Sequence, residues 1–136
     1  MSRRRKAREI ALQTLYAWEL TGEDWGKALR DNISRRNASD EASNYAERLV
    51  SAVVEEVSRL DQLISEKLEN WELKRVSIVD KNILRLALAE LLFSPEVPSA
   101  VIIDEAIELA SVFSSQDAGR FINGILDSLA KEVRAS

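Results

Sequence analysis

The chain has 136 residues, of which 46% are hydrophobic and 31% are charged, and its formal net charge is −4. This length supports one domain or two small helical subdomains that bury a real core. The chain contains no cysteine and no histidine, which excludes disulfides, Cys/His zinc sites, catalytic triads and acid–base catalysis by histidine.

The charge is distributed unevenly. Residues 1–20 carry five basic and two acidic residues, a net charge of +3, whereas residues 21–136 carry 14 basic and 21 acidic residues, a net charge of −7. A basic arm on an acidic body indicates a local anion-binding surface rather than a general affinity for nucleic acid. We find no apolar run of 18 residues and no signal-peptide pattern at the N-terminus, so we expect a cytoplasmic protein without a membrane segment.

With four glycines and two prolines, and apolar residues at helical spacing, the chain is expected to be all-α. The first helix is predicted from about Arg3 to Leu20, with Gly22 as the residue that ends it. Tyr16 lies about 20° around this helix from Arg5, so the basic arm and the tyrosine share an exposed face. This combination is what phosphate contact and base stacking require. The alternative is a solubilising basic start with an ordinary surface tyrosine.

A short second helix is expected over residues 24–36, followed by a polar break at residues 37–40. A third helix is then predicted from Glu41 to Glu69 without interruption, because apolar residues recur every three or four positions. It would span roughly 40 Å and serve as the spine that joins two halves. Its predicted buried stripe comprises Ala46, Val50, Val53, Val57, Leu60 and Ile64.

Ser77 and Asp80 form the pattern of a capping box at the start of the next helix. That helix is apolar over most of its circumference, which predicts the central helix of the second half. Glu90 falls on its most apolar side, where an unpaired carboxylate would cost several kcal/mol. We therefore expect a paired, structural Glu90, with catalysis as the alternative. Pro98 is predicted to occupy the first position of the following helix.

The stretch Ile103–Asp127 predicts an amphipathic helix and then a second helix with Ser114 as its N-cap and Asp117 three residues later. Phe121 falls at the margin of the second helix's buried stripe. Next to a cation and an exposed amide, it is a candidate base-stacking platform, with a peripheral core phenylalanine as the alternative. No phosphate loop, EF-hand or zinc-protease motif is present, so we expect no cofactor, no metal site and no enzymatic activity.

Three stretches in order, RRKAREIALQTLYAWEL, WELKRVSIVDKNILRLALAELL and VPSAVIIDEAIELASVFSSQDAGRFINGILD, resemble the NusB family of bacterial transcription antitermination factors. The resemblance covers nearly the whole chain. It implies two packed three-helix subdomains, here residues 1–70 with the basic arm and residues 71–136. It also implies binding to the boxA element of ribosomal RNA leader transcripts, as single-stranded RNA, together with NusE, a ribosomal protein. The pair would help RNA polymerase to resist termination.

The resemblance implies that the functional positions of the family lie at matching positions of this sequence. They form two RNA-facing patches and one contact with NusE, at Asp80. The first patch comprises Arg4, Arg5, Lys6, Arg8 and Tyr16. The second patch comprises Gln116, Asp117, Arg120, Phe121 and Asn123. Two other functions stay open: a helical adaptor that binds only proteins, and a homodimer in which self-association masks the arm. An RNA methyltransferase, to which NusB-like domains are also fused, is disfavoured because no cysteine is present.

Overall fold

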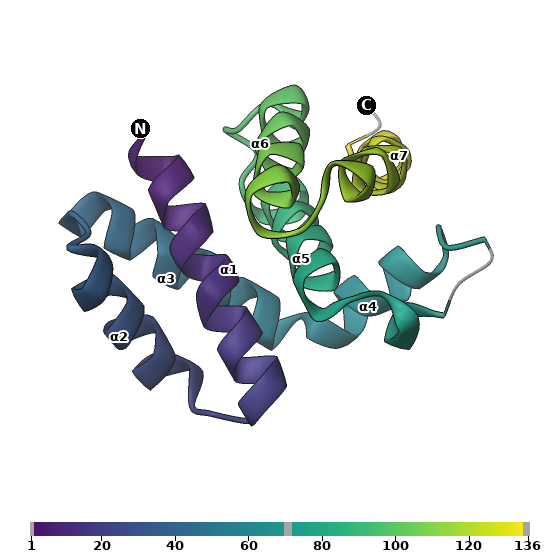
Figure 1. The fold of residues 1–136 in the computed structure, drawn as a ribbon. Coiled ribbons are helices and arrows are strands. Elements are labelled where there is room, and N and C mark those ends of the chain that lie inside the picture. Colours follow the sequence, from purple (N-terminus) through teal and green to yellow (C-terminus); the bar gives the residue numbers. More distant parts are fainter. Residues whose placement is uncertain (1, 70–71, 135–136) are drawn as a thin grey trace.

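The computed structural model describes residues 2–69 and 72–134, and in these ranges every regular element is a helix (Figure 1). This confirms the predicted all-α class. The elements in chain order are α1 (Arg3–Thr21), α2 (Trp25–Arg36), α3 (Asp40–Glu55), α4 (Val57–Ser65), the 3₁₀ turn η1 (Leu73–Arg75), α5 (Ile78–Phe93), α6 (Ser99–Phe113) and α7 (Gln116–Val133).

The helix ends follow local side-chain chemistry. Asp24, Ser39, Ser77 and Ser115 each accept a hydrogen bond from the backbone N–H three residues further on, which caps α2, α3, α5 and α7. Gly22 ends α1 with a left-handed backbone (φ 73°), as predicted, because a residue without a side chain adopts this conformation at low cost.

The predicted single helix from Glu41 to Glu69 is wrong. The chain turns at Glu56, where φ is −112° and ψ is 18°, and the second piece already ends at Ser65. No glycine or proline marks this turn, so its cause is tertiary: α3 packs against α1 and α5, whereas α4 packs against α5 and α7. The turn allows Val53 and Leu60 to be completely buried on these two different surfaces.

Two predicted helix starts are displaced by one residue. Ser115, not Ser114, caps α7, and Ser114 instead ends α6. Pro98 is the N-cap of α6, so the first helical position belongs to Ser99. The predicted boundary between the two halves, at residues 70–71, lies outside the described residues. Because α4 packs on α5 and α7, the division into residues 1–70 and 71–136 stays a prediction.

The central position predicted for the helix after Ser77 is confirmed. Figure 1 shows α5 in the middle of the molecule, and it packs against α1, α3, α4, α6 and α7. Every residue from Asn82 to Leu91 is buried. Among the described residues, no helix combines the length and the apolar character that crossing a bilayer requires. The fold therefore fixes α1 against one side of α5 and the pair α6–α7 against the other.

A network of charges ties three helices together at the start of α5. The Glu19 carboxylate of α1 accepts hydrogen bonds from Asn82 Nδ2 at 3.0 Å and Arg85 Nη1 at 2.5 Å, and it also pairs with Lys81. Arg85 donates two further bonds, of 2.7 and 2.8 Å, to Asp61 of α4. These contacts compensate the charge that burial of Arg85 would otherwise leave unpaired.

Candidate nucleic-acid interface

The first turns of α1 carry the predicted basic arm on the surface. Arg3, Arg4 and Arg5 have side chains that are 68%, 42% and 42% exposed. Each of them lies near a carboxylate from another element. Arg5, for example, donates from Nε and Nη2 to Glu105 of α6, with a shortest distance of 2.9 Å. An RNA phosphate that binds one of these arginines would therefore have to displace the carboxylate that is paired with it.

Arg5 and Lys6 differ in their surroundings. The hydrogen bonds and the negative charge of Glu105 raise the pKa of Arg5, so this pair is held in its ionised form. Lys6 is half-buried and has no carboxylate within 4 Å among the residues that the structure describes. An RNA phosphate could therefore bind Lys6 without breaking an ion pair within the described part of the protein.

Arg8 does not belong to the exposed arm, and the structure corrects this prediction. Its side chain is 5% exposed, and it donates from Nε and Nη2 to Glu90 at 2.6 and 2.8 Å. Tyr45 Oη also donates to Glu90, at 2.7 Å. Arg8 is one turn of helix after Arg5, but it lies on the side of α1 that faces α5. The paired Glu90 that the sequence predicted is confirmed, with Arg8 as its counterion.

Tyr16 lies at a shallow apolar groove between α1 and the end of α6. The groove has a volume of about 230 Å³ and is lined by Leu12, Gln13, Tyr16, Val79 and Phe113. The tyrosine is 39% exposed, so its ring is accessible from solvent. Phe113 is the last residue of α6, and the connection to α7 follows it directly (Figure 1). One end of the groove therefore lies close in the chain to the start of α7, where the second predicted patch begins.

The second patch divides into two sides of α7. Gln116, Arg120 and Asn123 are exposed and follow one another at four- and three-residue spacing, so they form one row on the helix. Phe121 and Asn123 are about 160° apart around the helix axis. A single flat ligand cannot contact both side chains from one side of α7. Gln116, Arg120 and Asn123 are hereafter called the α7 polar row.

Phe121 faces the end of α4. It is half-buried, packs at the edge of the hydrophobic core, and lines a hollow of about 530 Å³ together with Arg120, Gly124 and residues 66–69. Asp117 precedes Phe121 by one turn and is exposed. The ring packs against the core and also lines a hollow beside Arg120, so its role as a base-stacking platform stays a prediction.

Asp80 lies in the first turn of α5, directly after the groove residue Val79. Its backbone N–H donates to Ser77 Oγ at 3.1 Å, which confirms Ser77 as the N-cap and gives one of the two hydrogen bonds of the predicted capping box. Its carboxylate oxygen Oδ1 is buried and has no hydrogen-bond partner among the described residues. A buried acceptor without a donor costs about 1–3 kcal/mol. A partner that supplies a donor at this point would recover that cost.

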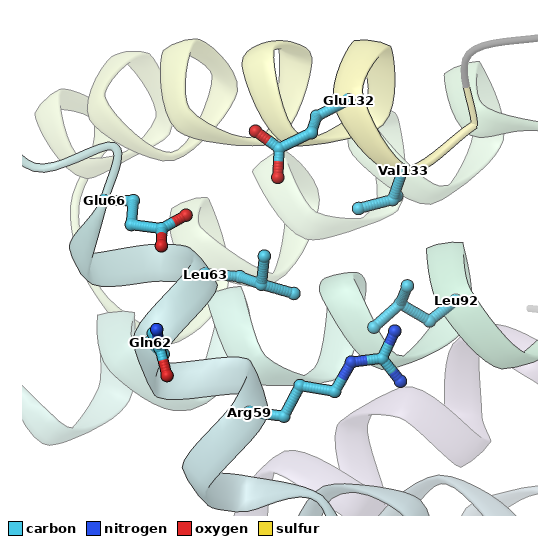
Figure 2. Close-up of a pocket in the computed structure, with 7 residues that line it drawn as sticks. All are labelled: Arg59, Gln62, Leu63, Glu66, Leu92, Glu132 and Val133. Carbon is cyan, nitrogen blue, oxygen red and sulfur yellow. The ribbon is translucent and has the colours of Figure 1, made fainter.

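A further hollow shares Glu66 with the hollow beside Phe121. The hollow has a volume of about 440 Å³ and lies between α4, α5 and α7. Figure 2 shows that its lining includes the apolar side chains of Leu63, Leu92 and Val133 and the carboxylates of Glu66 and Glu132. Acidic side chains at its edge disfavour a nucleic-acid strand. Within residues 2–69 and 72–134, no group of three acidic side chains could hold a metal ion. Neither the exposed arginines of the arm nor the α7 polar row lines this hollow.

The sequence did not identify the groove residues Val79 and Phe113. Both belong to helical apolar patterns that predict core positions, and in the structure both are partly buried against the core while they also line the groove. Gln13, which shares the groove, is one turn before Tyr16 and could have been found from the same helical face. The groove is thus a product of tertiary packing more than of any local motif.

Comparison with known proteins gives consistent matches. The model of the NusB family matches residues 5–131. The transcription antitermination protein NusB of Elusimicrobium minutum is 45% identical over 135 residues, covering 97% of this chain and 96% of the relative. The structure of NusB from T. maritima superimposes with a TM-score of 0.89 at 41% identity, covering 95% of this chain and 91% of that one. A chain in the crystal structure of the antitermination factors NusB and NusE in complex with double-stranded RNA has a TM-score of 0.89 at 30% identity, covering 97% and 98%.

Proposed function

The chain belongs to the NusB family of transcription antitermination proteins, a non-enzymatic RNA-binding family, and we propose that it binds boxA-type RNA of ribosomal RNA leader transcripts together with NusE. The bound pair would act on RNA polymerase so that transcription continues past terminators. Such a factor works where bacterial transcripts are made, in the cytoplasm. The observation that carries the proposal is that Arg5 and Tyr16 are both accessible on one side of α1, with Tyr16 at a groove that Phe113, the last residue of α6, also lines.

In this proposal the cations of the arm contact phosphates, with Arg4, Arg5 and Lys6 retained from the predicted set. The α7 polar row supplies one arginine and two amides for base edges and sugar oxygens. The ring of Phe121 would stack on a base beside Arg120 and Asp117. Arg8 is left out because Glu90 occupies its guanidinium in the interior.

We assign NusE to the apolar groove and Asp80. Val79 and Phe113 provide apolar contact area, and Asp80 provides a buried acceptor that lacks a donor. The acidic body, with a net charge of −7 outside the first twenty residues, favours a basic partner through complementary charge. Tyr16 lies where both surfaces meet, so it can contribute to RNA contact and to protein contact.

A protein-binding adaptor without appreciable RNA affinity is the second candidate. It is favoured by the carboxylates that already neutralise Arg3, Arg4 and Arg5, because RNA must displace them. Self-association through the arm is a form of the same alternative.

One titration separates these functions. Fluorescently labelled boxA-type single-stranded RNA is titrated with the protein alone and with an equimolar mixture of the protein and NusE, at two salt concentrations. We expect binding that is tighter with NusE, weaker at high salt, and at least tenfold weaker for a scrambled RNA. NusE binding without any RNA binding in either titration would establish the adaptor, and sedimentation of the protein alone would reveal a homodimer.

A further inference from the structure

Two arginines from different helices share one aromatic ring on the far side of the arm. The guanidinium carbon of Arg4 in α1 lies 4.5 Å from the ring centre of Tyr45 in α3, and that of Arg48 lies 5.6 Å from the same centre. Together with Arg3, Glu41 and Asn44, these side chains line a hollow of about 240 Å³. The sequence assigned no role to Tyr45, Arg48 or this hollow.

Arg48 is held in place from behind. Its Nη2 donates to the carbonyl oxygen of Phe93 at 2.9 Å and to Ser94 Oγ at 3.0 Å. The side chain is nevertheless 48% exposed. A guanidinium whose orientation is fixed by packing and hydrogen bonds loses little entropy when it binds an anion, which makes such a position suited to phosphate.

A single carboxylate lies close to both arginines. Glu96, in the connection between α5 and α6, has its Oε2 at 3.7 Å from Arg4 Nη2 and at 3.5 Å from Arg48 Nη1. A hydrogen bond from its own backbone N–H and the charges of Arg48 and Arg4 hold the pKa of Glu96 below its ordinary value. The carboxylate is therefore ionised at neutral pH. These distances are those of a loose ion pair, and the Glu96 side chain is 46% exposed.

We propose that Arg4, Arg48 and the ring of Tyr45 form a phosphate subsite for the RNA backbone, which Glu96 occupies when RNA is absent. An incoming phosphate takes the place of the carboxylate between the two guanidinium groups, and Glu96 turns into solvent. Because Glu96 is already half exposed and its contacts are long, little is lost when it leaves. The subsite would extend the RNA track from α1 across to α3.

The choice of an RNA phosphate rests on the proposed function and on continuity with the arm. Arg3 and Arg4 belong both to the hollow and to the exposed start of α1. A strand that contacts Arg5 and Lys6 can therefore reach Arg48 without leaving a basic surface. The stacking of Arg4 on Tyr45 keeps that guanidinium beside Arg48.

The test uses three variants of the full-length protein in the presence of NusE: Arg48→Ala, Glu96→Gln and, as a control, Arg59→Ala. Arg59→Ala removes the same charge, and Arg59 also lies over an aromatic ring, Phe93 at 6.0 Å. Arg59 lines the hollow of Figure 2, which shares no lining residue with the hollow of Arg4, Tyr45 and Arg48. Thermal unfolding of each variant shows whether the fold is kept. RNA affinity is measured over a range of salt concentrations.

We expect Arg48→Ala to weaken RNA binding by roughly fivefold relative to Arg59→Ala and to lower the salt slope by about 0.7, the value for one phosphate contact with a single strand. Glu96→Gln should tighten binding by roughly two- to fivefold because the competing carboxylate is gone. Equal RNA affinities for Arg48→Ala and Arg59→Ala would overturn the subsite. Unchanged or weaker RNA binding by Glu96→Gln would show that the Glu96 carboxylate does not occupy the subsite in the absence of RNA. If the wild-type protein itself binds no RNA, the proposed function fails instead.

Discussion

The guanidinium of Arg8 and the carboxylate of Glu90 form a two-bond ion pair in the interior, with Nε–Oε1 and Nη2–Oε2 distances of 2.6 and 2.8 Å. The pair joins α1 to α5, and Tyr45 adds α3 through a hydroxyl that donates to the same carboxylate. Burial and the negative charge of Glu90 raise the pKa of Tyr45, so the hydroxyl keeps its proton. The same tyrosine ring lies under Arg4, so the buried pair supports the surface arm directly.

The first prediction concerns this pair. Arg8→Met leaves Glu90 charged, buried and short of its main donor, and it should lower the free energy of unfolding by about 3–5 kcal/mol. The double variant Arg8→Met/Glu90→Leu should recover much of that loss, because both charges leave the interior together. Urea unfolding followed by circular dichroism measures both variants.

The double variant also tests the position of Arg8. If Arg8 has no contact with RNA, the folded double variant should bind RNA with the affinity and salt slope of the wild-type protein. A reduced salt slope in that variant would return Arg8 to the RNA-binding residues.

Local patterns predicted much of this structure, and tertiary packing accounts for the rest. The predicted pairing of Glu90 followed from the cost of an isolated buried charge, but its partner could not be named because Arg8 lies 82 positions earlier. The break at Glu56 was missed because nothing local stops a helix there. It arises where the chain moves from the surface of α1 to that of α7.

The candidate site shows the same limit. The helical spacing of Tyr16 and Arg5 placed both correctly on accessible parts of α1. Arg8 was misplaced because a run of basic residues was treated as one solvent-exposed cluster. Arg8 follows Arg5 by only three residues, and yet its side chain lies in the interior. Arg48 and Glu96 approach Arg4 from two other parts of the chain, and no motif links these three positions.

The second prediction concerns acid stability. Burial alone would raise the pKa of Glu19, but hydrogen bonds from Lys81 and Asn82 and the charge of Arg85 hold it below its ordinary value. A carboxyl whose pKa is lower in the folded than in the unfolded chain stabilises the fold fully at any pH above its pKa in the unfolded chain, which is about 4.3. This contribution is lost as the pH falls through the pKa that Glu19 has in the folded protein.

Glu19→Gln should therefore lower stability at pH 7 and show a smaller further loss between about pH 4.5 and pH 3 than the wild-type protein. Glu47→Gln, at an exposed position of α3, is the control and should keep the wild-type acid profile. Melting temperatures across this pH range measure both. If the melting temperatures of Glu19→Gln and of the wild-type protein fall in parallel with pH, the network does not depend on the charge of Glu19.

The third prediction concerns Phe121. Phe121→Leu keeps an apolar side chain at the edge of the core and removes the aromatic face. If a base stacks on the ring, RNA binding should weaken by about 1–3 kcal/mol with little change in salt slope, while stability changes by less than about 1.5 kcal/mol. Unchanged RNA affinity would leave Phe121 as a peripheral core residue. Phe113→Leu, at the apolar groove, should affect NusE binding more than RNA binding.

The last prediction concerns Asp80 and the protein partner. Ser77 already caps α5, so a carboxylate at Asp80 adds at most about 1 kcal/mol through the helix dipole. Its Oδ1 is buried without a donor, and removing its charge should therefore cost the free protein little. Asp80→Asn should keep the melting temperature within a few degrees of wild type. Asp80→Lys should weaken NusE binding by about 2 kcal/mol or more if the pair across the interface is desolvated.

Calorimetry with NusE, in the absence of RNA, separates this role from RNA contact. Tyr16→Ala serves as a companion variant, because it removes one of the groove's two aromatic rings and leaves Asp80 in place. If NusE covers the groove, both variants should lose NusE affinity, and Asp80→Lys should do so more strongly at low salt than at high salt. A folded Asp80→Lys protein with wild-type NusE affinity would remove Asp80 from the interface. Loss of RNA affinity alone in Tyr16→Ala would assign that ring to RNA, as its position beside the arm first indicated.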